Sequence, residues 1–245
     1  MNRLLSLIVL GLTVSHPTYI AAATNETELL QIKGVIAAIL HDNAEYSKQH
    51  SHAYFQRFAK SQHPRATVVT CSDSRVHDQA FEHSPDNDLF IVRDIGNQIK
   101  TAEGSVEYGI RHLHTPVLLI VGHSACGAVK AASSHFDKEP SAIRNELKTI
   151  KLDHIINTDD DSQVMLGVVD NLNHQVEFAM QKFSDETKTG KLLVIGAIYD
   201  FTNALHHGDG RIVIVNINGD NNQERVTHRL SGLLQAQNKL SKQHP

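Results

Sequence analysis

Two cysteine-containing motifs are the segments of this chain best suited to chemistry. The first, CSDSRV, begins at Cys71 and places Asp73 and Arg75 two and four residues later. The second, HSAC, begins at His123 and ends at Cys126. Thiolates and imidazoles are ligands that zinc prefers, and catalytic zinc sites often use three protein ligands and leave a fourth position for water. Cys71, His123 and Cys126 could therefore form a metal site.

The same two cysteines, the only ones in the chain, allow other interpretations. A disulfide is the ordinary use of a cysteine pair in an exported protein, and buried reduced thiols are a further alternative. The polar neighbours favour the metal site, because a structural disulfide needs neither the acidic and basic residues that follow one cysteine nor the histidine that precedes the other. Composition alone leaves the disulfide open.

Short β-branched runs lie just ahead of both motifs. ATVVT precedes the first motif and PVLLIV the second, and three similar runs are DLFIV, KLLVIGAI and RIVIVNI. Most are continuously apolar, and several are separated by segments long enough for a helix, which is typical of parallel strands covered on both faces. We therefore predict an α/β fold with a mostly parallel central sheet flanked by helices. Ligands bind beyond the carboxyl ends of such strands, so the two motifs should meet at one edge.

Helical periodicity predicts further elements at both ends of the chain. Apolar residues recur at helical spacing from Thr27 to Leu40, and a second helical stretch ends before Pro64, so residues 24–63 are expected to form an N-terminal helical arm. The tail from Val226 predicts a final helix. The aspartate-rich segment 153–163 is interpreted as a surface loop, since it lacks the glycine and distal glutamate of a calcium loop.

The first residues, MNRLLSLIVLGLTV, place an arginine ahead of an apolar run too short to span a bilayer. Small residues follow, so we expect residues 1–23 to be a signal peptide and residues 24–245 to form a single catalytic domain. The mature chain is expected in the periplasm, with secretion as the alternative. No later segment is apolar enough to predict a membrane span.

Charge and composition exclude some partners. The chain has 23 basic and 27 acidic residues and a formal net charge of −4, with no basic stripe that could follow a phosphate backbone. Nucleic acid is therefore not an expected partner. An apolar content of 40% indicates a globular protein.

CSDSRV, followed about fifty residues later by GHSACGAVKAA and then by VIGAIYD, resembles the signature of the β-class carbonic anhydrases of the exported bacterial type. The resemblance extends from roughly Ile32 to Ile217. It implies that Cys71, His123 and Cys126 hold one Zn²⁺ per subunit.

The resemblance also implies the reaction, which is the reversible hydration of carbon dioxide to bicarbonate and a proton by a lyase. Zinc lowers the pKa of bound water from about 15.7 toward 7, which gives a hydroxide that can attack carbon dioxide. By the same resemblance Asp73 and Arg75 form the catalytic dyad. Asp73 would orient the zinc-bound hydroxide, and Arg75 would hold that carboxylate ionised.

Further residues are expected to line the substrate pocket. Gln62, Phe90 and Tyr108 match the residues that line the family's cleft, some of them from the partner subunit, so the resemblance implies a homodimer or homotetramer. Without it, a loop amide, a strand core residue and a helix packing residue would be the ordinary interpretations. His77 is a candidate proton relay, although an exposed loop histidine without a catalytic role is the simpler alternative.

One departure concerns the family's pH-gated subgroup, in which the aspartate binds zinc and displaces water. That closed form is associated with a bicarbonate pocket that includes a tryptophan. This chain has no tryptophan, and Val68 occupies the matching position, although Val76 and Arg93 are present. We therefore expect the open form. Asp94 is a second departure from the family's pattern, because asparagine or a similar neutral residue is common at the matching position.

Two other functions remain possible from the sequence. One is a hydrolase of carbon disulfide type that uses the same fold and metal. The other is a non-catalytic zinc-binding protein of the cell envelope. Asp73 and Arg75 disfavour the second, because metal storage needs ligands but no dyad.

Overall fold

The computed structural model describes residues 26–243, with side-chain burial described for residues 28–235. The chain forms two compact units, one ending at Lys60 and the other beginning at Ser61. The predicted signal peptide, residues 1–23, lies outside the described residues and stays a prediction. None of the helices in the described part combines the length and the apolar character needed to cross a bilayer.

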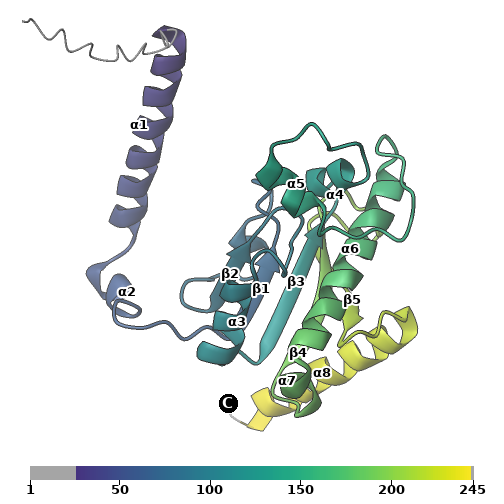
Figure 1. The fold of residues 1–245 in the computed structure, drawn as a ribbon. Coiled ribbons are helices and arrows are strands. Elements are labelled where there is room, and N and C mark those ends of the chain that lie inside the picture. Colours follow the sequence, from purple (N-terminus) through teal and green to yellow (C-terminus); the bar gives the residue numbers. More distant parts are fainter. Residues whose placement is uncertain (1–25, 244–245) are drawn as a thin grey trace, which may run out of the picture. The chain divides into compact units, whose positions relative to one another are not determined.

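The first unit consists of the helices α1 (Glu26–Gln49) and α2 (His52–Gln56) (Figure 1). Both predicted N-terminal helical segments are thus confirmed. The side chain of Ser51 caps α2 by accepting a hydrogen bond from the backbone N–H of Tyr54, which separates the two helices. The large apolar side chains of α1 remain between 40% and 65% exposed.

The second unit is built on a five-stranded sheet in the order β2-β1-β3-β4-β5. All five predicted strands are present: β1 (Ala66–Thr70), β2 (Leu89–Arg93), β3 (Val117–His123), β4 (Leu193–Asp200) and β5 (Arg211–Ile217). The first four strands pair in parallel, whereas β5 runs antiparallel to β4. The connection over residues 201–210 is too short for a parallel crossover, which needs about a dozen residues. The prediction of a mostly parallel sheet is confirmed.

Helix α6 (Asp161–Lys182) covers β3 and β4 on one face of the sheet (Figure 1). Its buried apolar residues recur every three or four positions, which places them on one side of the helix; they include Val164, Val168, Leu172, Val176 and Ala179. The remaining helical elements are η1 (Asp78–Ala80), α3 (Glu103–Glu107), η2 (Tyr108–His112), α4 (Gly127–Ala132), α5 (Ser141–Leu147), α7 (Ser184–Lys188) and α8 (Gln223–Gln243). The predicted C-terminal helix is thus confirmed as α8.

The aspartate-rich segment is a loop only in part, which corrects the prediction for residues 153–163. Asp160 ends the loop, and α6 begins at Asp161. The carboxylate of Asp160 accepts hydrogen bonds from the backbone N–H groups of Ser162 and Gln163, so it caps the helix. The acidic residues therefore mark a helix start, and the described residues of this segment form no metal-ligand cluster.

Gly196 in β4 gives a test of the contact between the sheet and α6. A β-carbon added there would lie 2.9 Å from a methyl group of Val176 and 3.0 Å from the β-carbon of Asn216. We expect Gly196→Ala to lower the free energy of unfolding by about 1–3 kcal/mol, because the core has no room for the methyl group. Urea unfolding would measure the change.

Gly232 in α8 provides the matched control, since an added β-carbon there meets nothing within 4 Å. Gly232→Ala should raise the stability by up to about 1 kcal/mol through helix propensity. Equal effects of the two substitutions would contradict the close packing described for Gly196.

Candidate metal centre

The two cysteine motifs meet because their strands are neighbours in the sheet. Cys71 follows β1 directly, and His123 is the last residue of β3. Thr70 pairs with Val121 in parallel, so the carboxyl ends of both strands lie side by side. Cys126 occupies the N-cap position of α4.

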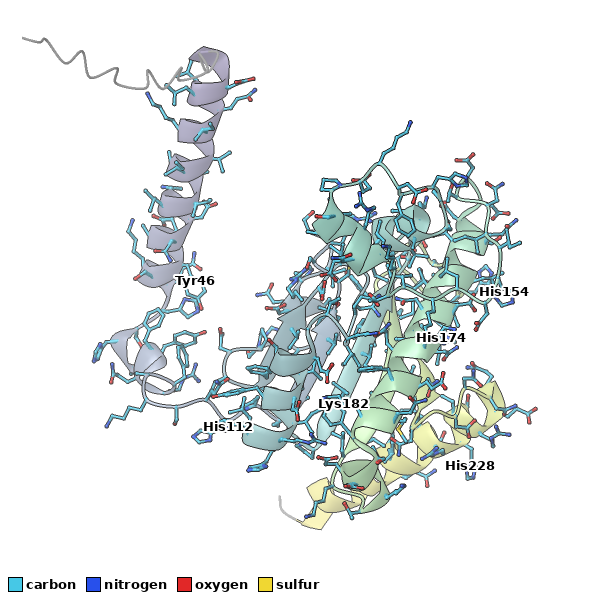
Figure 2. The ribbon with its side chains drawn as sticks, viewed as in Figure 1. Tyr46, His112, His154, His174, Lys182 and His228 are labelled. Carbon is cyan, nitrogen blue, oxygen red and sulfur yellow. The ribbon has the colours of Figure 1, made fainter. Side chains whose placement is uncertain are left out.

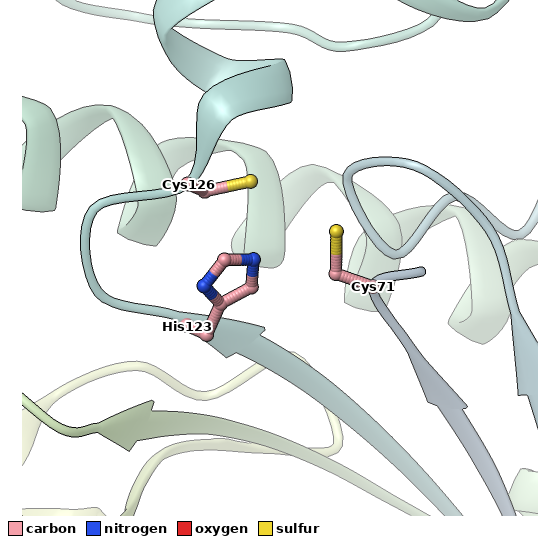
Figure 3. Close-up of side chains that lie close together, drawn as sticks. All are labelled: Cys71, His123 and Cys126. Carbon is pink, nitrogen blue, oxygen red and sulfur yellow. The ribbon is translucent and has the colours of Figure 1, made fainter. Parts of the chain in front are cut away.

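The structure brings the three predicted ligands together (Figure 3). One ligand atom from each of Cys71, His123 and Cys126 lies within 4.8 Å of the others, and all three residues are buried. Ala125 has a left-handed backbone (φ 53°), which turns the chain between the histidine and the second cysteine. Among the described residues, this is the one group of three or more such side chains placed to hold a metal ion.

A hydrogen bond fixes which ring nitrogen of His123 is available. Nδ1 lies 2.9 Å from the carbonyl oxygen of Ser124, an acceptor, so Nδ1 carries the proton and Nε2 keeps a lone pair. Nε2 is buried and has no hydrogen-bond partner. A buried polar atom without a partner is costly, and the ring nitrogen points toward the two sulfur atoms in Figure 3. The group fits a metal ion that binds nitrogen and sulfur.

Both cysteines are free thiols, so the disulfide considered from composition is not formed. A hydrogen bond with the Cys126 thiol lowers the pKa of Cys71 to about 4, with further help from His123 and from the backbone N–H of Gly96 at 3.4 Å. The pKa of Cys126 is raised, because its protonated thiol is held by the hydrogen bond with Cys71, and because burial and the negative charge of Cys71 both disfavour its ionisation. Without metal, the pair thus shares one proton, which a divalent cation would replace.

Asp73 and Arg75 form a forked ion pair beside the three ligands. Nε of Arg75 donates to Oδ1 of Asp73 at 2.9 Å, and Nη2 donates to Oδ2 at 2.6 Å. These hydrogen bonds hold the pKa of Asp73 well below its usual range. Oδ2 also lies 3.8 Å from Nε2 of His123, so the carboxylate borders the metal centre.

Arg75 and Arg93 stabilise the loop that carries the dyad. Arg75 donates to the carbonyl oxygen of Ala125 at 3.2 Å, which ties the first motif to the second. Arg93 donates to the carbonyl oxygens of Asp73 and Val76 from the neighbouring strand β2. Arg93 therefore holds the loop backbone within this chain.

The predicted pocket residues do not reach the ligands within one chain. Phe90 pairs with Thr67, four residues before Cys71, which places it about 13 Å back along the sheet. The rings of Phe90 and Tyr108 lie 5.9 Å apart, and Gln62 is exposed. Their predicted role needs a second subunit and stays a prediction.

The remaining residues named from the sequence are His77, Asp94 and Val68. His77 is exposed and directly precedes η1. Its role as a proton relay stays a prediction. Asp94 is half-buried and accepts a hydrogen bond from the hydroxyl of Thr101 at 2.6 Å, while burial raises its pKa. Val68 is fully buried in β1.

The sequence interpretation missed Phe201, which follows β4 at the same edge of the sheet. Its ring lies 4.9 Å from the guanidinium carbon of Arg75 and 5.8 Å from the ring of His123. The buried carboxylate of Asp200 accepts hydrogen bonds from the backbone N–H groups of Thr202 and Leu205, which fixes this loop. A signal was available, because the strand predicted from KLLVIGAI ends only a few residues before Phe201.

The sequence interpretation also missed the support behind Cys71. Gly96 has a left-handed backbone (φ +71°) and directs its N–H toward the Cys71 sulfur. Its carbonyl oxygen accepts hydrogen bonds from the side chains of Gln98 at 2.7 Å and Asn171 at 2.8 Å. Asn171 belongs to α6, so no local pattern could have indicated this contact.

We expect the folded, metal-free protein to carry about one thiolate per chain at neutral pH, because the pKa of Cys71 is about 4. Cysteines with an ordinary pKa of about 8.5 would carry almost none. The ultraviolet absorbance of the thiolate, compared before and after unfolding at the same pH, measures the difference. Cys71→Ser should remove the signal, and equal absorbance in the folded and unfolded wild type would contradict the shared proton.

Comparison with known proteins agrees with this geometry. The family model "Carbonic anhydrase" matches residues 66–206. A carbonic anhydrase of Synechococcus elongatus is 29% identical over 186 residues, which are 69% of this chain and 68% of the relative. One from Mycolicibacterium smegmatis is 40% identical over 80 residues, which are 32% of this chain and 39% of the relative.

Solved structures share the fold. A tetrameric β-carbonic anhydrase of Sordaria macrospora superposes with a TM-score of 0.64 at 23% identity, over 75% of this chain and 98% of the other. A Coccomyxa β-carbonic anhydrase superposes with a TM-score of 0.63 at 22% identity, over 78% of this chain and 90% of the other. With its sheet, its Cys-His-Cys cluster and the family match over more than half its length, the chain belongs to the carbonic anhydrases and has the β-class fold.

Proposed function

We propose that this carbonic anhydrase catalyses the reversible hydration of carbon dioxide to bicarbonate and a proton, with one zinc ion per subunit held by Cys71, His123 and Cys126. The observation that carries the proposal is the unpartnered, buried Nε2 of His123 beside two free thiols. A buried nitrogen with an unused lone pair, next to two thiols that can lose their protons, is stabilised when a cation binds to these atoms.

The donor set supports zinc in particular. Two thiolates and one imidazole are the soft and borderline donors that zinc prefers over magnesium or calcium. Ligand atoms of a tetrahedral zinc site lie about 3.5–3.8 Å apart, given bonds of about 2.3 Å to sulfur and 2.0 Å to nitrogen. The three atoms already lie within 4.8 Å of one another, so only a small contraction is needed.

Zinc supplies a Lewis acid that makes a hydroxide nucleophile available near neutral pH. The protein's own part is to orient that nucleophile. Ionised Asp73 can only accept hydrogen bonds. Oδ1 already accepts two, from the backbone N–H and from Nε of Arg75, whereas Oδ2 accepts one from Nη2 and keeps a lone pair. With Oδ2 3.8 Å from Nε2 of His123, the carboxylate is placed to accept the nucleophile's O–H and direct the oxygen lone pair at carbon dioxide.

Arg75 acts on the reaction through Asp73. Its fork prevents rotation of the carboxylate, and its contacts with Ala125 and Phe201 hold the guanidinium itself in place. A zinc-storing protein would have no use for this arrangement, whereas a hydrolase of carbon disulfide would. The test therefore also compares carbon dioxide with carbon disulfide as the substrate.

Asp73→Asn keeps the shape of the side chain but removes its charge, so we expect carbon dioxide hydration to fall by about 10²-fold or more with unchanged zinc content. A stopped-flow assay with a pH indicator measures the rate. Because the pKa of Asp73 lies below its ordinary value of about 3.9, Asp73 stays charged as the pH falls to 5. Any loss of activity between about pH 5 and 8 should arise from other groups.

Asp88→Asn is the matched control, because Asp88 forms an equivalent fork with Arg65 away from the ligands. It should leave hydration unchanged within about twofold. Absence of turnover by the zinc-loaded wild type would contradict the proposal. Faster turnover of carbon disulfide than of carbon dioxide would favour the hydrolase.

Removal of the metal should expose the two cysteines to chemistry. We expect zinc-loaded protein to resist alkylation by iodoacetamide, because both sulfurs are buried and coordinated. After chelation, Cys71 should react or form a disulfide with Cys126. Mass spectrometry of peptides, with elemental analysis of the same sample, would detect each outcome, and rapid labelling of fully loaded protein would contradict ligation.

We propose that the chain forms a homodimer or homotetramer. The support is the apolar side of α1, where Ile32 and Ile36 are each 52% exposed and Ile39 is 61% exposed. Contiguous exposed apolar residues of this kind usually mark a protein interface. The Sordaria relative of the same fold is described as tetrameric.

Replacing Ile32 and Ile36 together by Glu should shift the protein toward monomers, with an association constant at least about tenfold weaker, because two charges would have to be buried. Sedimentation equilibrium of the full chain measures this. His41→Glu adds charge to an exposed polar position on the opposite side of α1 and should leave the assembly unchanged. An unaltered assembly of the double variant would contradict the proposed interface.

A further inference from the structure

A cavity lies away from the metal centre, between α6 and the chain that follows α5. Its volume is about 210 Å³, and Lys100, Lys148 and Lys151 all line it. His174, which Figure 2 shows on α6, lies at the same cavity. None of these residues belongs to the metal-ligand group or to the dyad.

Three lysines and one glutamate line the cavity, so positive charge exceeds negative charge there. Within the described residues none of the three lysines forms an ion pair with a carboxylate. The one carboxylate among the residues that line the cavity belongs to Glu177, and it already accepts a hydrogen bond from Gln181 at 3.2 Å and lies 3.7 Å from His174. This local excess contrasts with the chain's formal net charge of −4.

The floor of the cavity is ordered and its polar atoms are satisfied. Gln175 is 4% exposed, and its amide accepts from the backbone N–H of Ile99 at 2.9 Å and donates to Gln98 at 2.9 Å. The hydroxyl of Thr149 donates to Gln98 at 3.0 Å. The groups left to bind a ligand are therefore the lysine ammonium groups, each with three donors.

We propose that this cavity binds a small phosphate-bearing anion. A multiply charged anion would balance the excess of positive charge among the lining residues, and lysine is a common point-charge ligand of phosphate. A volume of 210 Å³ is far more than the roughly 10–15 Å³ of cavity that one water molecule needs. The room beyond one phosphate group favours a phosphate ester or a diphosphate over free phosphate.

Isothermal titration of the zinc-loaded full chain with inorganic phosphate, pyrophosphate and glycerol phosphate tests the proposal. We expect one molecule per chain, with the ester or pyrophosphate tighter than phosphate and all three weakened by added salt. Tightest binding of inorganic phosphate would assign the cavity to the free ion and overturn the preference for a larger ligand.

The test variant is Lys100→Gln, Lys148→Gln and Lys151→Gln together. Its matched control is Lys60→Gln, Lys138→Gln and Lys188→Gln, which changes the net charge equally at exposed positions outside the cavity. Affinity for pyrophosphate should fall by more than about tenfold in the test variant, because charge-assisted hydrogen bonds are lost. The control should change it less than about threefold.

Acetylation of the wild type gives an independent measurement that needs no substitution. Pyrophosphate should slow the modification of Lys100, Lys148 and Lys151 while leaving Lys138 and Lys188 unaffected. No binding, equal weakening in both triple variants, or binding that persists in the test variant would each overturn the proposal. The last result would place the anion elsewhere, including at the metal centre.

Discussion

The parallel pairing of β1 with β3 is the constraint on which the site depends. Cys71 and His123 are far apart in the sequence, and each leaves its strand at the same edge of the sheet. The pairing is supported from α6, whose apolar side covers β3 and β4. The precision of the ligand group is thus a property of the core, because a sheet buried on both faces allows little slippage of register.

Burial gives the site its chemistry. Two thiols and an imidazole removed from water would be costly as a set of separate polar groups, and here they satisfy one another only in part. The Asp73–Arg75 fork is arranged differently, since every charge in it is paired and the carboxylate remains partly open to solvent. The group that could hold a metal and the ion pair beside it therefore differ in their electrostatics.

The sequence predicted what depends on periodicity and on motif spacing. All five strands, the N-terminal and C-terminal helices and the cluster of Cys71, His123 and Cys126 agree with the structure. It failed where a local pattern had two interpretations, as for Asp160, whose acidic neighbours suggested a solvated loop but mark a helix start.

Contacts between distant segments could not be predicted where neither segment carries a motif. The contact between Asn171 and Gly96 joins α6 to a loop after β2, and nothing in either segment indicates the other. Phe201 is intermediate, because its strand was identified but the direction of its ring depends on the buried hydrogen bonds of Asp200. The role of Gln62, Phe90 and Tyr108 depends on a second subunit and is untested by a single chain.

The buried amides behind Gly96 have a consequence for folding order. Gly96, whose N–H faces the Cys71 sulfur, has its full set of contacts only after Asn171 arrives with α6, seventy-five residues farther along the chain. Contacts of such long separation form slowly, because the intervening loop must close first. The support behind Cys71 should therefore be completed late in folding, and until then the thiols remain open to oxidation.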